Sequence, residues 1–207
     1  MRKLIVSMNI SLDGYVSGPD CELNWHFKSW TREMGDALCS ELEKADTILL
    51  GRITYGAMAK YWPSKIANAS CSGEDFAFAS MMNNYAKIVF SKTISSAEWN
   101  NSKLVKGNLQ DEIIVLKNMP GKNIIVYGSG RLVAALTESG MIDEYHLWLH
   151  PVILGNGKPL FHPDSYWKQK WLYLKLVNSK TFPSGVIMLH YETIKIKENE
   201  KVESKNM

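Results

Sequence analysis

Two short motifs place glycine and arginine between an apolar run and a helical pattern, GRITY at residues 51–55 and GSGRL at residues 128–132. Glycine lets the backbone approach a phosphate closely, the free N–H groups of a helix's first turn point toward an anion, and arginine adds charge-assisted hydrogen bonds. Each motif is therefore a candidate phosphate site, although ordinary strand-to-helix loop chemistry explains either one taken alone. Because ligands of open α/β sheets bind at the carboxyl ends of strands, two such sites on one sheet would suit a ligand with phosphates at two places, as in a dinucleotide.

Neither motif is a standard nucleotide-binding fingerprint. The segment Gly128-Ser129-Gly130 lacks the third glycine of the dinucleotide-binding motif, because Val133 occupies that position. It also comes late in the chain rather than after the first strand. Gly51 is not followed by the Gly-Lys-Ser/Thr of a Walker A loop. These departures disfavour a Rossmann domain and a Walker A site.

The polar side of the first predicted strand is a third candidate. Apolar and polar residues alternate there, which predicts one apolar and one polar face. The polar residues are Ser7, Asn9, Ser11 and Asp13, interleaved with Val6, Met8, Ile10 and Leu12. Buried polar groups are costly unless they are hydrogen-bonded, so a ligand pocket is a natural place for this face. For the carboxylate of Asp13, the alternative role is a turn-forming Asp-Gly pair with Gly14.

Apolar runs and helical patterns alternate through the first two thirds of the chain. Runs without alternation predict strands buried on both faces at 46–50, 87–90 and 123–127. Helical spacing predicts helices at 34–45, 53–60, 74–85, 110–118 and 130–139, the last with Gly140 as its C-cap. Later strands at 142–151, 171–181 and 186–196 predict an antiparallel end to the sheet. The predicted fold is α/β, a three-layer αβα sandwich with a mixed, mostly parallel central sheet and antiparallel C-terminal strands.

Length and composition bound the class of protein. The chain has 207 residues, of which 45% are hydrophobic, and a formal net charge of +3. This predicts one domain over residues 1–194 and a disordered tail at 195–207. Scattered basic residues disfavour nucleic-acid binding, and no apolar run is long enough to predict a signal peptide or a membrane span. Cys21, Cys39 and Cys71 contain no C-x-x-C pair, which fits reduced thiols in a cytoplasmic protein.

Four motifs, in their order along the chain, carry a resemblance to a known family. They are SLDG at 11–14, LGRITY at 50–55, VYGSGRL at 126–132 and PVILGNG at 151–157. With these motifs the chain resembles the dihydrofolate-reductase-like fold and, within it, the reductase domain of bacterial riboflavin biosynthesis and its relatives. The resemblance extends from Lys3 to about Tyr191.

The resemblance implies NADPH as the hydride donor. Together with Asn9 on the polar face, the cofactor residues it implies are Gly51, Arg52, Thr54, Ser91, Lys92, Gly128, Ser129, Gly130, Arg131 and Leu132. Arg52 and Thr54 would lie near the phosphates, and residues 128–132 would surround the pyrophosphate at the start of a helix.

Two of these assignments have stated alternatives. Ser91-Lys92 matches the family segment near the adenosine 2′-phosphate, where a cation and a hydroxyl would favour NADPH over NADH, but it also fits a solvated strand end. The resemblance places Asp13 near the nicotinamide and the substrate. There it would be catalytic, orienting a substrate amine or hydroxyl or helping to deliver a proton.

The residues leave the substrate open. Dihydrofolate reductases carry an acidic residue early in the first helix, a few residues past a tryptophan. If LNW at 23–25 matches that segment, the corresponding place falls near Trp30, which disfavours folate reduction. The riboflavin-pathway reductase often accompanies a deaminase domain, but the chain has no P-C-x-x-C zinc motif. We expect an NADPH-dependent reductase of a small heterocyclic or carbonyl-type substrate; the alternative is a non-catalytic, nucleotide-binding dimeric protein of the same fold.

Two features of the last third concern metals and partners. His146 and His150 alternate onto one face of a predicted strand, but no third ligand accompanies them, so no metal site is predicted. The aromatic residues of the late strands predict internal packing or a dimer face, and we expect a homodimer.

Overall fold

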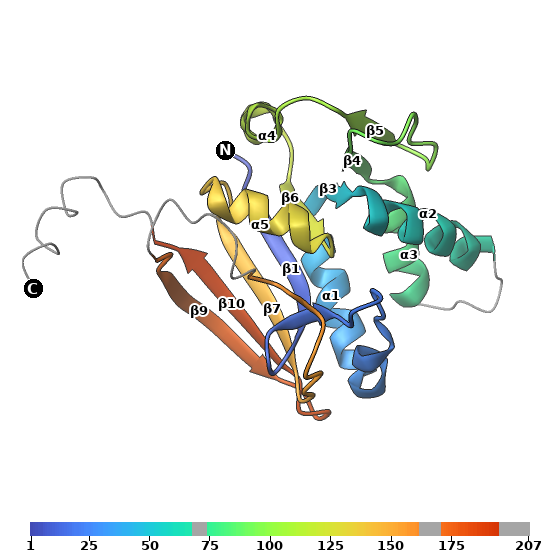
Figure 1. The fold of residues 1–207 in the computed structure, drawn as a ribbon. Coiled ribbons are helices and arrows are strands. Elements are labelled where there is room, and N and C mark those ends of the chain that lie inside the picture. The colour runs from blue at the N-terminus through green and yellow to red at the C-terminus, as the bar shows by residue number, and fades with distance from the viewer. Residues whose placement is uncertain (68–73, 162–170, 195–207) are drawn as a thin grey trace, which may run out of the picture.

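The structure is a computed structural model of the chain, and it describes residues 1–67, 74–161 and 171–194. Eight strands of these segments form one sheet in the order β5-β4-β3-β6-β1-β7-β10-β9 (Figure 1). The strands are β1 (Leu4–Ser11), β3 (Ala45–Gly51), β4 (Ala86–Phe90), β5 (Ser102–Val105), β6 (Asn123–Tyr127), β7 (Glu144–His150), β9 (Leu174–Thr181) and β10 (Ile187–Thr193). A separate antiparallel pair joins β2 (Tyr15–Ser17) to β8 (Lys158–Pro159). The predicted tail at 195–207 lies outside the described residues.

The direction of the strands confirms the predicted mixed sheet. From β5 to β7 every neighbouring pair is parallel, whereas β10 is antiparallel to both β7 and β9. The helices are α1 (Arg32–Leu42), α2 (Arg52–Ala67), α3 (Glu74–Asn84), α4 (Leu109–Asn118) and α5 (Gly130–Glu138), with a 3₁₀ turn η1 (Asn24–Ser29) before α1. Parallel strands need long crossover connections, and these helices provide most of them. None of the described helices is both long and apolar enough to cross a membrane.

Helices cover both faces of the sheet and make the three predicted layers (Figure 1). On one face, Val6, Ile124 and Val126 pack against residues of α4 and α5. On the other face, Ile48 and Ile125 pack against residues of α1, α2 and α3. The central strands are therefore buried on both sides, as their uninterrupted apolar runs predict.

The polar face of β1 is covered by protein rather than open. Ser7 and Ser11 are buried, and Asn9 is half-buried. The Ser7 hydroxyl donates to Glu41 Oε2 of α1 at 2.8 Å and accepts from Trp148 Nε1 of β7 at 3.1 Å. Alternation thus predicted the two faces correctly, but part of the polar face is satisfied by other side chains.

Several boundaries differ from the prediction. Helix α2 begins at Arg52 and continues past Pro63 to Ala67, although a proline inside a helix removes one hydrogen bond. The short elements β2, β5, β8 and η1 were not predicted, because two to six residues carry too little pattern. The C-terminal strands are shorter than predicted. Gly140 has φ +65° just beyond α5, which confirms its place at the helix end.

Lys87 is a charged residue inside the core. Its side chain is fully buried, and Nζ donates to the carbonyls of Met82, Asn83 and Tyr85 at 2.8–3.0 Å. The ammonium also lies 4.5 Å from the centre of a Trp99 ring. Burial lowers the pKa of Lys87 to about 8, so the group stays mostly charged at neutral pH and caps the end of α3.

Candidate functional site

The glycine-arginine turns and Ser91-Lys92 lie at the carboxyl ends of three neighbouring parallel strands. Strand β3 has β6 as its parallel neighbour on one side and β4 on the other, and Gly51 pairs with Phe90. Parallel neighbours end at the same edge, so the segments that follow Gly51, Phe90 and Tyr127 start side by side. The structure therefore brings together three segments that are separated by about 40 residues from one to the next in the sequence.

The two turns are bonded directly to each other. Ser129 Oγ accepts a hydrogen bond from the Gly51 N–H at 2.8 Å, and the Ser129 N–H donates to Thr54 Oγ1 at 3.0 Å. Gly128 and Ser129 both have left-handed backbones, with φ of +63° and +61°. A Cβ at Gly128 would lie 2.9 Å from Thr54 Cγ2, so only glycine allows this approach. The hydroxyls of Thr54 and Ser129 thus position the turns.

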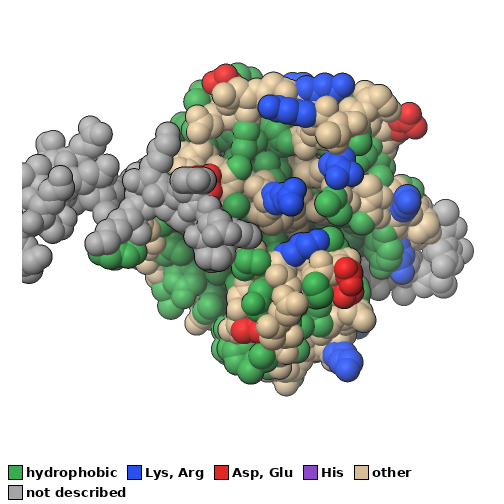
Figure 2. Space-filling model, viewed as in Figure 1, with side chains coloured by type: hydrophobic (Ala, Val, Ile, Leu, Met, Phe, Trp, Pro, Cys, Tyr) green, Lys and Arg blue, Asp and Glu red, His purple; other side chains and the backbone are tan. Residues whose placement is uncertain are grey.

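The charged side chains of this edge point to a role in binding anions. Arg52 begins α2, Arg131 lies in the first turn of α5, and Lys92 follows β4; all three are exposed. The backbone bonds at the start of α5 run from the Leu132 and Val133 N–H groups to the Ser129 carbonyl, so the N–H groups of residues 130 and 131 precede them, and the positive end of the helix dipole adds to the arginine charge. Figure 2, which has the view of Figure 1, shows Lys and Arg side chains gathered on the face that carries α5.

The Ser91 side chain forms hydrogen bonds within its own turn. Its hydroxyl accepts from the backbone N–H groups of Thr93 and Ile94 at 3.2 and 3.4 Å. Its own N–H donates to the Val105 carbonyl at 3.1 Å. The exposed Lys92 follows two residues after Phe90, the partner of Gly51 in the sheet, and a role in binding a 2′-phosphate stays a prediction.

A small cavity of about 40 Å³ lies beside the turns on the α1 side of the sheet. It is lined by Ser7, Met8, Asn9, Trp30, Leu38, Tyr127 and Trp148. Tyr127 directly precedes Gly128, and its buried hydroxyl has no hydrogen-bond partner within the described segments. Burial, with the nearby Glu41 charge, raises the pKa of Tyr127 well above its ordinary value, so the hydroxyl keeps its proton. The cavity therefore offers a hydrogen-bonding group that the protein does not use.

The alternating pattern of the first strand placed Ser7 and Asn9 on this wall, and the resemblance named Trp30 only as the place of the acidic residue of folate reductases. Tyr127 and Trp148 were not predicted to line a site. The sequence signal for Tyr127 was its position immediately before GSGRL, because the last residue of a strand lies next to the turn that follows it. Trp30 and Trp148 come from η1's end and from β7, and no local pattern connects them to the motif.

Asn9 is held in place by His150. His150 Nε2 lies 2.9 Å from Asn9 Oδ1, and the Ser29 hydroxyl lies 2.7 Å from His150 Nδ1. Burial, with the nearby His26, lowers the pKa of His150 to about 4, so the ring is neutral. A neutral ring with Nε2–H donating to Asn9 and Nδ1 accepting from Ser29 satisfies both contacts.

Asp13 joins two of the four motifs. Its carboxylate accepts from the Ser11 hydroxyl at 2.7 Å, from the Gly155 N–H at 2.8 Å and from the Leu154 N–H at 3.1 Å. The bond from Ser11, followed by those from the 155 and 154 amides, lowers the pKa of Asp13 below its ordinary value. These contacts support the turn-forming alternative and link residues 11–14 to the loop at 151–157; the catalytic role stays a prediction.

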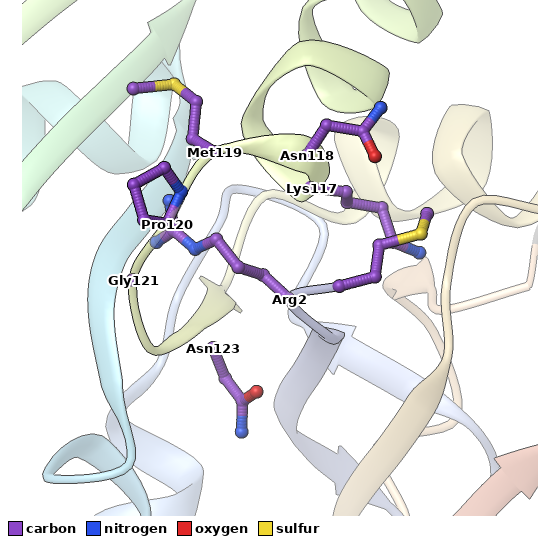
Figure 3. Close-up of a pocket in the computed structure, with 8 residues that line it drawn as sticks. Arg2, Lys117, Asn118, Met119, Pro120, Gly121 and Asn123 are labelled. Carbon is purple, nitrogen blue, oxygen red and sulfur yellow. The ribbon is translucent and has the colours of Figure 1, made fainter.

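A larger hollow of about 520 Å³ lies at the opposite end of the sheet, between the start of β1 and the loop after α4 (Figure 3). Two basic residues line it, but both are already paired. Arg2 bonds to Asp46 and Thr47, and Lys117 bonds to Asp143. The amino ends of strands are also not where open α/β sheets bind ligands. We therefore assign the candidate site to the small cavity and the turns.

Comparison with known proteins places this arrangement in a family. The family model of the RibD C-terminal domain matches residues 2–188. The chain belongs to the RibD C-terminal domain family. The uncharacterized protein YyaP of Bacillus subtilis is 34% identical over 190 residues, which cover 92% of this chain and 94% of that protein.

Two solved structures show that the RibD C-terminal domain fold is shared. A putative riboflavin biosynthesis protein from Shewanella sp. PV-4 is similar with a TM-score of 0.71 and 22% identity, over 93% of this chain and 99% of the other. A diaminohydroxyphosphoribosylaminopyrimidine deaminase/5-amino-6-(5-phosphoribosylamino)uracil reductase from Thermotoga maritima has a TM-score of 0.61 and 14% identity, over 93% of this chain and 57% of the other. These likenesses confirm the predicted fold, and the family match confirms the resemblance to the reductase domain of riboflavin biosynthesis.

Proposed function

We propose that the chain is an NADPH-dependent reductase of a small heterocyclic or carbonyl-type substrate. The observation that carries the proposal is the junction of the two turns through Ser129, which sets Arg52 and the start of α5 beside the small cavity. Membership of a family whose solved neighbours include a named reductase supports the same activity.

The residues present fit a dinucleotide. Arg52, Arg131 and the first N–H groups of α5 would hold the phosphates, and Lys92 would pair with a 2′-phosphate. The cavity of about 40 Å³ has room for about one water molecule, so the unpartnered Tyr127 hydroxyl and the Asn9 side chain would bond to a small polar group at the edge of a bound ligand. NADPH, when bound, supplies a hydride to the substrate. Asp13 would hold the neighbouring loop through the 154 and 155 amides and, in its catalytic role, would orient a substrate amine or hydroxyl, since its hydrogen bonds favour the ionised form.

Fluorescence titration of the purified chain with NADPH and with NADH tests cofactor binding. We expect saturable binding that favours NADPH. Arg52→Ala should weaken NADPH binding by about tenfold or more, since it removes a charge-assisted phosphate contact. Lys60→Ala removes an equally exposed charge further along α2 and serves as the matched control. No saturable binding, or equal affinities in the two variants, would refute the phosphate assignment.

Turnover separates the reductase from the non-catalytic alternative. NADPH oxidation is followed at 340 nm, the absorbance of the reduced nicotinamide, across a panel of pterins, pyrimidines and quinones. Oxidation that depends on one substrate class supports the reductase. Tight NADPH binding without oxidation across the panel supports a nucleotide-binding protein that lacks turnover.

A homodimer is the second part of this proposal. Edge strand β9 and its surroundings expose apolar side chains, and Figure 2 shows hydrophobic side chains over β9 and β10. Those that are more than two-fifths exposed are Trp171, Tyr173, Leu176, Val177 and Ile194. An exposed apolar edge strand invites pairing with a second copy. Light scattering coupled to size exclusion should give the mass of two chains, and Leu176→Asp should shift it to one; a monomeric wild type would refute the proposal.

A further inference from the structure

A polar cluster lies on the α1 side of the sheet, near the amino end of β7 and away from the turns. Glu144 and His146 are two residues apart on β7 and so share a face, and His190 is the residue of β10 that pairs with His146. The three side chains are largely buried. One ligand atom from each lies within 4.8 Å of the other two.

The hydrogen bonds around His146 leave acceptor atoms facing one another. His146 Nδ1 donates to Glu41 of α1, and the other Glu41 oxygen accepts from Ser7. In a neutral ring, Nε2 then carries a lone pair, and this atom lies 3.3 Å from Glu144 Oε2. His190 Nε2 lies 3.1 Å from the same oxygen without hydrogen-bond geometry and has no other hydrogen-bond partner within the described segments. Two nitrogens and one oxygen thus converge on a place that favours a cation.

A proton can satisfy only some of these three converging atoms. A proton on His146 satisfies one nitrogen and one oxygen, and it leaves His190 Nε2 with only the poorly aligned 3.1 Å contact to Glu144 Oε2. A metal ion satisfies all three atoms. The N–O separations of 3.3 and 3.1 Å are close to the edge of about 3.3 Å that a tetrahedron has when its bonds are about 2.0–2.1 Å, the length of zinc–nitrogen and zinc–carboxylate bonds.

The charges around the cluster also favour a divalent ion. Glu41, Glu144 and Glu192 carry negative charge, and Lys3 is their one ion-paired ammonium in the described segments. Lys3 contacts Glu144 through Oε1 and lies 3.3 Å from Glu192, so Oε2 of Glu144 remains directed at the two histidines. With neutral histidines this group of four charged residues has two excess negative charges, which a divalent cation would balance.

We propose that Glu144 Oε2, His146 Nε2 and His190 Nε2 bind a divalent transition-metal ion, Zn²⁺ fitting best, with the fourth position open to water. Two histidines and a carboxylate form a known zinc ligand set. Glu41 is a positioning residue, because a carboxylate on Nδ1 fixes the ring and raises its basicity toward a metal. The expectation of no metal site rested on the lack of a third ligand beside His146 and His150. His150 instead bonds to Asn9, and the missing ligands come from β10 and from Glu144.

The ion would fasten β10 to β7, so its effect is expected on stability. It lies about four residues, or about 13 Å, from the end of β7 near Asn9. The proposal therefore does not depend on the proposed reductase, and its test needs no activity.

Zinc binding is measured by calorimetry on the full, tag-free chain after removal of metals with EDTA. We expect a single saturable Zn²⁺ site and a rise in the melting temperature with added zinc. Co²⁺ is a second probe, since four-coordinate Co²⁺ with nitrogen ligands gives intense visible absorption and hydrated Co²⁺ does not. Absence of saturable zinc binding together with a hydrated-type Co²⁺ spectrum overturns the proposal without any variant.

Variants distinguish zinc binding at this cluster from nonspecific zinc binding to other histidines. His190→Gln should weaken zinc binding more than about tenfold and abolish the rise in melting temperature, since it removes one ligand. Glu41→Gln should weaken binding about 10- to 100-fold while the four-coordinate Co²⁺ spectrum persists. His26→Phe, which removes a histidine outside the cluster, should leave both probes unchanged. Equal zinc affinity in His190→Gln and the wild type would place the ion elsewhere and overturn the assignment.

Discussion

Replacing Ser129 by alanine removes the acceptor that joins the two turns. The Gly51 N–H loses its hydrogen bond to Ser129 Oγ, while the Ser129 backbone N–H keeps its bond to Thr54. The bond is partly buried, so leaving the donor unpaired should lower the free energy of unfolding by about 1–3 kcal/mol. Because this bond holds the segment after β3 against the start of α5, the variant should also bind NADPH more weakly.

Ser129→Gly provides a matched comparison. It removes the same hydroxyl but relieves the left-handed backbone at φ +61°, a conformation that costs a residue with a Cβ about 1 kcal/mol. The glycine variant should therefore be more stable than the alanine variant by about 1 kcal/mol. Ser64→Ala, which removes an exposed hydroxyl bonded to the Tyr61 carbonyl, is the control for loss of a serine.

Urea denaturation followed by circular dichroism measures these differences in unfolding free energy. An unchanged slope of that free energy against urea concentration shows that the variants unfold to the same extent. We expect stability to fall in the order wild type, Ser129→Gly, Ser129→Ala, with Ser64→Ala within about 0.5 kcal/mol of the wild type. Equal stability of Ser129→Ala and Ser64→Ala, or NADPH binding by Ser129→Ala as tight as that of the wild type, would contradict a joining role for the Ser129 hydroxyl.

Further predictions concern the core, acid stability and the loop beside the site. Lys87→Met should lower the unfolding free energy by about 3 kcal/mol, because it leaves three carbonyls at the end of α3 without their donor; an unchanged urea midpoint would contradict this. Burial lowers the pKa of His26 and of His150 to about 4, so the unfolded chain takes up protons first as the pH falls below about 6.5. The stability that the two neutral histidines contribute is thus fully present above pH 6.5, and the free energy of unfolding should fall between about pH 6.5 and 4 by up to about 3 kcal/mol per histidine. His26→Phe should make this fall with pH less steep. Urea midpoints that do not change with pH would count against the burial of the two neutral rings. Asp13→Asn should accelerate hydrogen exchange at the two loop amides that its carboxylate binds, and equal exchange rates would show that the carboxylate does not hold the loop.

The sequence by itself determined the layout of the parallel sheet and its turns. Runs such as 46–50 and 123–127 contain apolar, mostly branched residues without alternation, and this pattern depends only on burial of both faces of a strand. Glycine at 128 is required by a left-handed backbone, which is a local property that a motif can reveal. The choice of the carboxyl edge for the candidate site followed from the strand direction alone, since strands joined by helices run parallel.

Only the tertiary structure decided which side chains meet. Asp13 binds amides about 140 residues away, and His146 receives its neighbours from α1 and β10, because pairing between distant strands depends on the packing of the whole sheet. Sequence spacing therefore paired His146 with His150, whereas the structure pairs it with His190. The same holds for Lys87, which lies in a predicted strand but becomes a buried helix cap once α3 packs above it. Local periodicity determines which face of an element a residue occupies. The contacts on that face come from elements distant in the sequence, about which local periodicity carries no information.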